Sequence, residues 1–291
     1  MAEGGWPRIA AKLLALVPKN AMSRLAGRVV RACLPGPLQR AQIRLFGSVF
    51  GVDFEESRDP IASFACFQDF FTRALRDGAR PVDTAPDALV SPCDGCWGTS
   101  GTVAGGQVLQ VKGSPYSLAE LLGSADDAAG LEGGSFATFY LSPRDYHRFH
   151  APCAGRFGLA RHLPGALWPV NRVGLEGVSG LFARNERICA RFEVERPAGG
   201  VAGVLWLVAV GATMVGSVRV AFDDLTTNRR GAEAVERDYG SAGRRYEKGE
   251  EWGRFEFGST IVMIAAPGLV DLEGEPQGAP LVLGTRIGSL R

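Results

Sequence analysis

Four residues of this chain have the chemistry of an activated nucleophile: a serine, an aspartate and two histidines. Ser259 follows Gly258, and a glycine there permits backbone angles that strain the peptide bond ahead of the serine. His147 and His150 are two of only three histidines in the chain, and Asp94 lies in a turn after an apolar run. An imidazole can remove the proton of a serine hydroxyl, while a carboxylate holds that imidazole in the required tautomer. These residue types therefore supply what a serine nucleophile needs.

The sequence around Ser259 differs from that of an ordinary serine hydrolase. It lacks the pattern G-x-S-x-G, and Ser259 opens the apolar run 260–264 instead of following a strand. A Gly-Ser-Thr triplet is also typical of a plain turn before a strand, and Asp94 is typical of a residue that caps a turn. The residues alone therefore leave a catalytic and a purely structural interpretation open.

His147 and His150 are three positions apart. In an extended segment this odd spacing places them on opposite faces, so we expect them to have different roles. Surface or core histidines without a chemical role are the alternative. We expect no metal site, because Cys93 and Cys96 form a lone C-x-x-C without a second cysteine or histidine pair at matching spacing.

The composition indicates a soluble, globular protein with a β-rich core. The chain has 291 residues, of which 46% are hydrophobic and 22% charged, and this excludes disorder as its main state. Its 39 glycines and 17 prolines indicate many turns and short strands. We predict an α+β fold, with a β-rich core of sandwich-like or barrel-like antiparallel sheets and with amphipathic helices at the N-terminus. The six cysteines are scattered and follow no signal-peptide pattern, so we expect a reducing compartment.

The elements that must position the four residues follow from hydrophobic periodicity. A helix is predicted over 64–76, with its phenylalanines facing inward. Buried strands are expected over 88–90, 97–99, 108–111 and 136–141, with a helical turn over 117–122. The uncharged run 201–218 contains three glycines and many β-branched residues, so two buried strands are favoured over a membrane span. A last strand is predicted to begin at Ser259, followed by a loop-rich tail.

Residues 1–50 differ in charge from the rest of the chain. They carry eight basic residues and one acidic residue, a net charge of +7, whereas the remainder carries 24 basic and 30 acidic residues. A helix capped by Asn20 and running to about Cys33 has apolar residues on one arc and arginines opposite, and a further helix is expected over 38–50. This pattern is typical of a helix that lies on an anionic membrane surface. Helices packed on the core, or an organelle transit peptide, are the alternatives.

Seven blocks of this sequence resemble the phosphatidylserine decarboxylases, and they occur in the order that this family has them. They span residues 67 to 264, about two thirds of the chain, and are jointly specific. The basic N-terminal helices resemble the membrane-associated bacterial and mitochondrial branch. The blocks are Phe67 to Pro81, Ser91 to Gly95, Tyr140 to His150, Pro169 to Asn171, Leu181 to Arg187, Val210 to Ser217 and Gly253 to Thr260.

The resemblance implies a proenzyme that cleaves itself between Gly258 and Ser259. In the family's scheme Asp94 orients His150, His150 deprotonates Ser259, and the serine oxygen attacks the Gly258 carbonyl, so that an amide becomes an ester. Elimination and loss of ammonia then convert Ser259 into a pyruvoyl group. The implied products are a large chain, 1–258, and a small chain, 259–291, held together in a catalytic domain that covers 51–291.

The same resemblance implies a pyruvoyl-dependent decarboxylase that converts phosphatidylserine to phosphatidylethanolamine without a metal. The pyruvoyl carbonyl condenses with the substrate amine and takes up the electrons released as CO2 leaves, the role that pyridoxal phosphate has elsewhere. His147 matches the family histidine that orients the substrate carboxylate or protonates the carbanion. The implied protein is a homodimer, peripheral on the cytoplasmic face of the bacterial inner membrane through residues 1–50, with no nucleic-acid partner.

Three other functions were weighed against this hypothesis. A relative with the same machinery would decarboxylate a soluble amino acid such as tryptophan, but the amphipathic N-terminal segment favours a lipid. A non-catalytic membrane-surface binding protein is disfavoured because Asp94, His147, His150 and Ser259 are all present. A serine hydrolase with the same triad would be labelled at Ser259 by a fluorophosphonate without cleavage of the chain.

Overall fold

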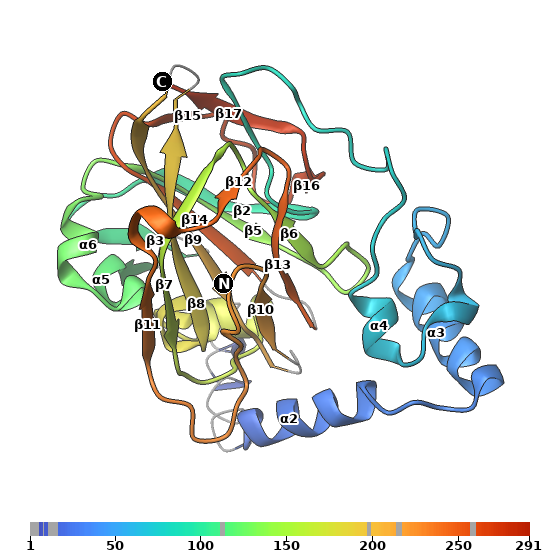
Figure 1. Cartoon of the computed structure of the whole chain (residues 1–291). Helices are drawn as coiled ribbons and strands as arrows, with labels where there is room; N and C mark the ends of the chain where they lie inside the picture. The colour runs from blue at the N-terminus through green and yellow to red at the C-terminus, as the bar shows by residue number, and fades with distance from the viewer. Residues whose placement is uncertain are drawn as a thin grey trace.

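The computed structural model describes residues 6–7, 9–10, 17–110, 114–196, 199–213, 217–256 and 260–291. A β-rich body fills most of the molecule, and two N-terminal helices lie along one end of it (Figure 1). The helices are α2 Lys19–Val30, α3 Gly36–Phe50, α4 Phe67–Phe71, α5 Leu118–Leu122, α6 Ala125–Ala129, α7 Arg172–Gly177 and α8 Leu181–Arg184, with 3-10 turns η1 Ile61–Ser63 and η3 Gly240–Ala242.

The strands pair antiparallel, so that the expected α+β fold with a β-rich antiparallel core is confirmed. The first nine strands are β1 Ala88–Val90, β2 Gly95–Thr102, β3 Gln107–Leu109, β4 Pro115–Ser117, β5 Ser135–Tyr140, β6 Arg148–His150, β7 Gly155–Leu163, β8 Arg187–Glu195 and β9 Val201–Val210. The others are β10 Val218–Val220, β11 Val235–Asp238, β12 Arg245–Tyr246, β13 Glu251–Phe255, β14 Thr260–Ala265, β15 Val270–Leu272, β16 Pro280–Leu281 and β17 Arg286–Leu290.

A large sheet forms the centre of the molecule, and β14 lies in its middle. Within the described residues its order is β11-β7-β8-β9-β14-β5-β2-β16, with β12 also paired to β7. Every residue of β14 is buried, and the strand pairs with β5 on one side and β9 on the other. Its sequence, Thr-Ile-Val-Met-Ile-Ala, is the continuous apolar run that a strand covered on both faces requires. Thr260, the first residue of β14, is thereby fixed opposite both Tyr140 and Val210.

The two faces of this sheet pack against different layers, as the period-two alternation of a strand dictates. On one face Ile261 and Met263 join a core that also contains Phe149, Trp252 and Phe255 from a smaller sheet. On the other face Val262, Ile264 and Phe136 pack against helices α5 and α8. The molecule is therefore a sandwich of sheets with helices on its remaining face.

The smaller sheet has the order β10-β13-β6, and its outer face is polar. Val218, Phe255 and Phe149 point into the core, while their neighbours along each strand point outward. Arg219 lies opposite Arg254, which lies opposite Arg148, and Glu251 lies opposite His150. Because directly opposed residues project to the same face, these five side chains form one outward surface.

The N-terminal helices contact the body through short polar anchors and one apolar cluster. In α2 the buried positions are Lys19, Ser23 and Gly27. Asn20 donates a hydrogen bond from Nδ2 to the Gly165 carbonyl at 3.0 Å, and the Lys19 ammonium lies 3.8 Å from the centre of the Trp168 ring. In α3, by contrast, Ile43 is fully buried in a cluster with the phenylalanines of α4.

Several sequence predictions are confirmed and three are wrong. The helix expected over 38–50, the strands at 88–90, 97–99 and 136–141, and one strand within 201–218, β9, are present; β10 begins only at Val218, the last residue of that run. The helix predicted over 64–76 is only Phe67–Phe71, because Arg148 binds the Thr72 carbonyl through Nε and Nη2 at 2.9 and 2.8 Å and the chain then turns away. Asn20 lies inside α2 and does not cap it. The tail after β14 contains three further strands.

Candidate active site

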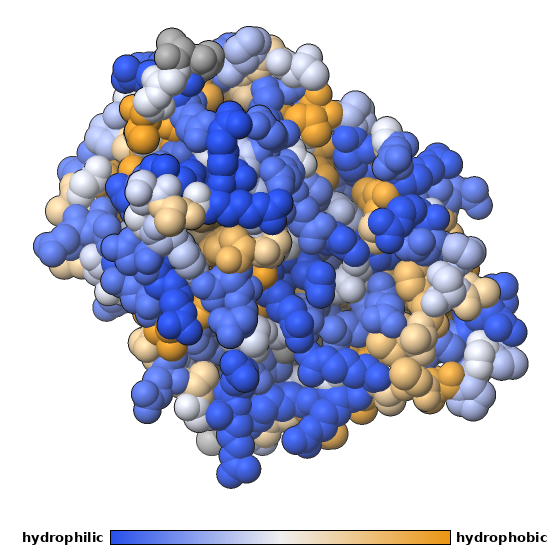
Figure 2. Space-filling view, viewed as in Figure 1, coloured by the Kyte–Doolittle hydropathy of each residue, from blue (hydrophilic) through white to orange (hydrophobic). Residues whose placement is uncertain are grey.

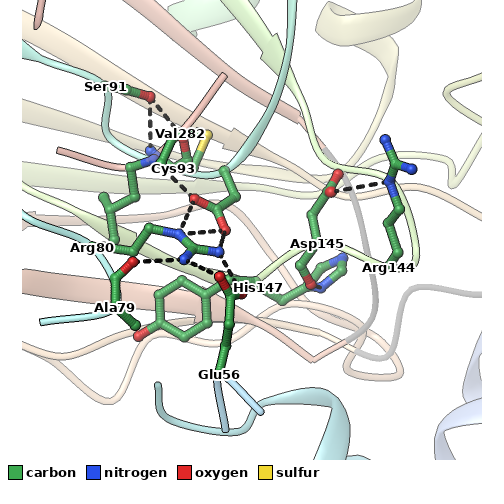
Figure 3. Close-up of polar contacts among 12 residues, drawn as sticks. Glu56, Ala79, Arg80, Ser91, Cys93, Arg144, Asp145, His147 and Val282 are labelled. Atoms are coloured by element: carbon green, nitrogen blue, oxygen red, sulfur yellow. Dashed lines mark hydrogen bonds and ion pairs between the residues drawn. The ribbon is translucent and has the colours of Figure 1, made fainter. Parts of the chain in front are cut away.

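Asp94 lies in the turn before β2, and its carboxylate is held by an arginine (Figure 3). Arg80 donates from Nε to both Asp94 oxygens at 2.9 and 3.0 Å, and from Nη2 to Oδ2 at 2.7 Å. The backbone N–H of Leu283 donates to Asp94 Oδ1 at 2.8 Å. The same guanidinium binds both carboxylate oxygens of Glu56 at 2.7 and 2.8 Å. The hydrogen bonds to Glu56 are the largest cause that raises the pKa of Arg80, and those to Asp94 raise it further. Asp94 is thus a fixed, buried negative charge.

His147 is completely buried beside Phe71, with ring centres 4.0 Å apart. Its Nδ1 lies 2.7 Å from the Asp145 carbonyl, so Nδ1 carries the proton and donates it. Its Nε2 is buried and has no hydrogen-bond partner among the described residues. Burial, and secondly the charge of Arg73, lower the pKa of His147 to about 3. His147 is therefore a neutral imidazole with a free lone pair on Nε2.

His150 lies on the outer face of β6 in a more polar setting. Its Nδ1 donates to the Gly249 carbonyl at 2.8 Å, and its Nε2 lies 3.4 Å from the Tyr146 hydroxyl. Burial is the main cause that lowers the pKa of His150, while the Gly249 carbonyl and the charges of Glu251 and Asp94 raise it. His150 thus holds its Nε2 as a base at neutral pH.

The expected contact between Asp94 and His150 is not formed among the described residues. The Asp94 oxygens bind Arg80 and Leu283, and the Gly249 carbonyl binds the nitrogen of His150 that a triad carboxylate would bind. Asp94 nevertheless acts on His150 through its charge, which is among the causes that raise the pKa of that histidine. The structure therefore brings the two residues into electrostatic range without a hydrogen bond.

Phe257, Gly258 and Ser259 lie outside the described residues, and the described residues on either side are held by backbone hydrogen bonds. Before them, the backbone N–H of Phe255 donates to the His147 carbonyl at 2.9 Å. After them, Thr260 is locked between β5 and β9. The predicted cleavage site is therefore bracketed between the segment that carries both histidines and the central strand of the large sheet.

Glu256 fixes the chain just before this site. It is buried, its backbone N–H donates to the Ser217 carbonyl at 2.7 Å, and its carboxylate also accepts from the Ser217 hydroxyl. Arg31 of the N-terminal region and Arg219 of β10 donate to the two carboxylate oxygens at 2.6 and 2.7 Å. A buried carboxylate requires such partners, because an unpaired charge in the interior is costly.

A small cavity of about 140 Å³ opens beside Thr260. Its walls are mostly apolar and come from β2, β5, β14 and the region of α7 and α8. The hydroxyls of Thr138 and Thr260 are buried and have no hydrogen-bond partner among the described residues. The cavity therefore offers two hydroxyls, in mostly apolar walls, to a small polar group.

Sequence reasoning missed the arginines of this region. Arg80 and Arg73 lie in the first of the quoted blocks, yet neither was assigned a role. Arg73 is buried, its Nη2 is 3.5 Å from the Arg144 carbonyl, and its Nε has no partner among the described residues. The three arginines of this block were the signal, because a buried carboxylate such as Asp94 needs a cationic partner. In the part of the chain that the structure describes, no cluster of His, Cys, Asp and Glu side chains could hold a metal ion.

The sequence is similar to one family throughout its catalytic part. The sequence model of the family "phosphatidylserine decarboxylase" matches residues 67–289. A phosphatidylserine decarboxylase proenzyme of Acidovorax ebreus is 45% identical over 280 residues, which cover 95% of this chain and 96% of the relative. A proenzyme of the same description from Myxococcus xanthus is 40% identical, with 95% of this chain and 96% of the relative covered. Another from Brevibacillus brevis is 38% identical, with 94% of this chain and 94% of the relative covered.

Proposed function

The chain belongs to the phosphatidylserine decarboxylase family, and we propose that it cleaves itself between Gly258 and Ser259 to build the site that does the chemistry. Its activity is the removal of CO2 from the serine headgroup of phosphatidylserine, which leaves phosphatidylethanolamine. The observation that carries the proposal is the bracketing of position 259 between the His147 carbonyl and the central strand β14. The described residues that supply the two imidazoles and the buried carboxylate thus support a site that Ser259 would complete.

In this proposal His150 is the base for self-cleavage. Its Nδ1 proton is donated to the Gly249 carbonyl, which leaves Nε2 to take the proton of the Ser259 hydroxyl. The serine oxygen then attacks the Gly258 carbonyl carbon, the C–N bond between residues 258 and 259 breaks, and an ester replaces the amide. The geometry favours His150 over His147 for this step, because His150 is the histidine whose charged form has negative neighbours.

Asp94 is proposed to stabilise the imidazolium that His150 becomes. Arg80 and the Leu283 N–H hold its carboxylate in place. A fixed anion nearby lowers the free energy of a developing cation, and this effect is strong where water is excluded. The orienting role expected for Asp94 from the sequence is thereby replaced by an electrostatic one, because the Gly249 carbonyl orients His150.

The pyruvoyl group that Ser259 would yield is an electron sink for the bond between the substrate's α-carbon and its carboxylate. The residues present fit such a group, because a buried imidazole nitrogen without a partner, His147 Nε2, lies in the same region. With its pKa near 3, His147 stays neutral at neutral pH and can accept a hydrogen bond at Nε2. We propose that His147 serves decarboxylation in this way and takes no part in cleavage.

The small chain 259–291 is proposed to remain in the fold after cleavage. It contains β14, which pairs with neighbours on both sides and is buried throughout. Burying one Val, Ile or Met side chain contributes about 1.5–3 kcal/mol, so this strand alone accounts for several kcal/mol of association. Both products of the precursor therefore stay together in one catalytic domain.

The N-terminal helices are proposed to lie on the membrane surface. Met22, Leu25 and Val29 of α2 are 41%, 59% and 58% exposed, while Ser23 and Gly27 face the body. On α3 Leu45 and Val49 are each 67% exposed, and hydrophobic surface gathers over α3 at the lower right of Figure 2. Helices packed on the core would bury these side chains, so an apolar solvent is the better fit. Among the described residues no helix is long and apolar enough to cross a bilayer.

The relatives reported above are bacterial, and the proposed location is accordingly the cytoplasmic face of the inner membrane, with cleaved protomers paired as a homodimer. The test of substrate class compares phosphatidylserine in anionic vesicles with free tryptophan and free serine, each followed by CO2 release. We expect turnover of the lipid and none of the free amino acids. Turnover of a free amino acid at a comparable kcat/KM would contradict the assignment of a lipid substrate.

A further inference from the structure

A deep groove lies between α2 and the outer face of the β10-β13-β6 sheet. Its volume is about 710 Å³, and it is open to solvent. Arg24 and Arg28 of α2 form one wall, Arg219 and Arg254 of the sheet form the floor, and the segment 223–230 closes the other side. The proposed function gives none of these elements a ligand to bind.

Positive charge dominates this groove. Seven arginines line it, against the acids Asp223, Asp224 and Glu251. Two of the acids are already engaged, because Asp223 accepts the Tyr239 hydroxyl at 2.5 Å and Glu251 pairs with Arg148 at 2.9 Å. Two of the arginines, Arg31 and Arg219, are likewise taken by Glu256.

Five arginines remain without a carboxylate partner among the described residues: Arg24, Arg28, Arg229, Arg230 and Arg254. Arg254 is the most informative, since its Nε is buried and makes no hydrogen bond within the described part of the chain. Its neighbours across the strands, Arg219 and Arg148, are paired with Glu256 and Glu251, so Arg254 is the cation in this row without a carboxylate among the described residues. Such a cluster is built to hold phosphate, which accepts several guanidinium hydrogen bonds at once.

The groove adjoins the candidate active site across one strand. Glu251, on its edge, lies directly opposite His150, and Arg254 lies opposite Arg148 in the same register. Strands in a sheet are about 5 Å apart, so the outer-face side chains of β10 lie within about 10 Å of those on β6. In a phosphatidylserine molecule only one oxygen and one methylene carbon separate the phosphorus from the carbon that bears the amine and carboxylate. A headgroup bound beside His150 therefore places its phosphate close to this groove.

We propose that the arginine groove is the subsite for the phosphodiester of the phospholipid substrate, with Arg254 as its central ligand. The inference rests on the proposed function and adds the residues that select a phosphorylated headgroup. It also explains why the arginines of α2 face the groove while its apolar stripe faces away: the phosphate lies on one side of the helix and the acyl chains on another. The sheet floor and the helix wall thus bind parts of one lipid.

The test uses the full-length, processed protein and dihexanoyl phosphatidylserine below its micelle concentration, so that membrane recruitment does not enter. Arg254→Gln and the double variant Arg24→Gln/Arg28→Gln are compared with Arg286→Gln, a control on β17 that pairs with Asp87. Arg254→Lys retains the charge. Rates are expressed per processed small chain. Glycerophosphoethanolamine serves as a competitor that carries the phosphodiester without the carboxylate.

We expect Arg254→Gln to raise KM about tenfold or more, the size of one lost hydrogen bond to a charged group, with kcat within about twofold. The competitor should inhibit the wild type and lose potency by a similar factor in the variant. Arg254→Lys should recover part of the loss, and Arg286→Gln should behave as wild type. Unchanged KM and unchanged inhibition in the groove variants would overturn the subsite. If the groove variants lose binding to vesicles but keep their KM and their inhibition, the subsite is also overturned, since the arginines would then only attract the protein to a membrane surface. A processed wild type that fails to decarboxylate the lipid would instead refute the proposed function.

Discussion

The N-terminal helices and the catalytic sheets differ in how far their apolar side chains are exposed. In β14 every residue is buried, whereas Leu25 and Val29 of α2 are more than half exposed and it is Ser23 and Gly27 that face the body. The arginines differ as well: Arg80 beside Asp94 is held in ion pairs with two carboxylates, while Arg24 and Arg28 of α2 line an open groove. A chain that buries apolar groups in one region and exposes them in another is adapted to two environments. The sheets carry chemistry away from water, and the helices meet a lipid surface.

If this division is correct, changes in one region should leave the function of the other intact. Glu256 is the contact between the regions that lies nearest to Ser259 in the sequence, because Arg31 from the end of α2 binds a carboxylate three residues before it. The exposed apolar side chains of α2 and α3, by contrast, are separate from the two histidines. Five substitutions or conditions can break or sharpen the comparison.

The largest effect is expected at His150. His150→Ala removes the proposed base, so self-cleavage should slow by about 10²–10⁴-fold, and the protein should accumulate at full length. Binding to anionic vesicles should be unchanged, because α2 and α3 are untouched. Denaturing gel electrophoresis over time measures cleavage. A variant that cleaves at the wild-type rate would remove His150 from this role.

His147→Ala is expected to separate the two reactions. Cleavage should proceed, whereas decarboxylation per processed chain should fall by about 10²–10⁴-fold. Because His147 is fully buried, His147→Gln serves as a second variant that retains volume and polarity. If cleavage fails in both variants while His150→Ala cleaves normally, the assignments of the two histidines are reversed.

Acidification should destabilise the catalytic region in a way that depends on His147. Its pKa is lowered to about 3 in the folded protein, so between about pH 6.5 and pH 3 the unfolded state binds a proton that the folded state does not. The free energy of unfolding should therefore decrease as the pH is lowered through this window, by up to about 1.4 kcal/mol per pH unit. Above pH 6.5 the stabilising contribution of the neutral His147 is fully present. Urea unfolding of wild type and His147→Gln measures the slope. Equal slopes in both proteins would contradict the burial of a neutral His147.

Polar substitution of the α2 stripe should weaken membrane binding alone. Leu25→Ser together with Val29→Ser removes exposed apolar groups, and we expect vesicle affinity to fall about tenfold or more. Turnover of monomeric short-chain substrate should not change. Val201→Ser, a matched change at an exposed position of β9, is the control. These substitutions are preferable to deletion of residues 1–50, which would also uncover the phenylalanines that Ile43 packs against. Unaltered vesicle binding would place the membrane contact elsewhere.

The smallest effect is expected at the link between the regions. Arg31→Gln removes one of two arginines from Glu256, but Arg31 is half exposed and Arg219 remains. We expect a loss of about 1 kcal/mol or less in stability and a modest slowing of cleavage. Thermal unfolding and the cleavage time course test this. A complete block of cleavage would show that the two regions are tightly coupled and would break the comparison.

Sequence patterns predicted the elements that depend on local periodicity and missed those that depend on distant contacts. Strand β14 was predicted because an uninterrupted apolar run requires burial on both faces. The helix over 64–76 was predicted too long, because its end is set by Arg148 on the Thr72 carbonyl, and Asn20 was misassigned because it bonds to Gly165. These partners are far apart in the sequence.

The candidate site shows the same limit. The residue types of Asp94, His147, His150 and Ser259 indicated their chemistry, but their hydrogen-bond partners were not predictable. Arg80 occupies the carboxylate that was expected to hold His150, and a backbone carbonyl holds His150 in its place. Backbone groups carry no signature in the sequence, so tautomers and contacts of this kind follow only from the fold.

The most direct test of the central claim is the intact mass of the purified protein under denaturing conditions. The account predicts two species that meet at residues 258 and 259, with the small chain lighter than its unmodified sequence by the exchange of an amine for a carbonyl and reactive toward a hydrazide. A single full-length chain that persists after incubation with anionic vesicles would contradict it.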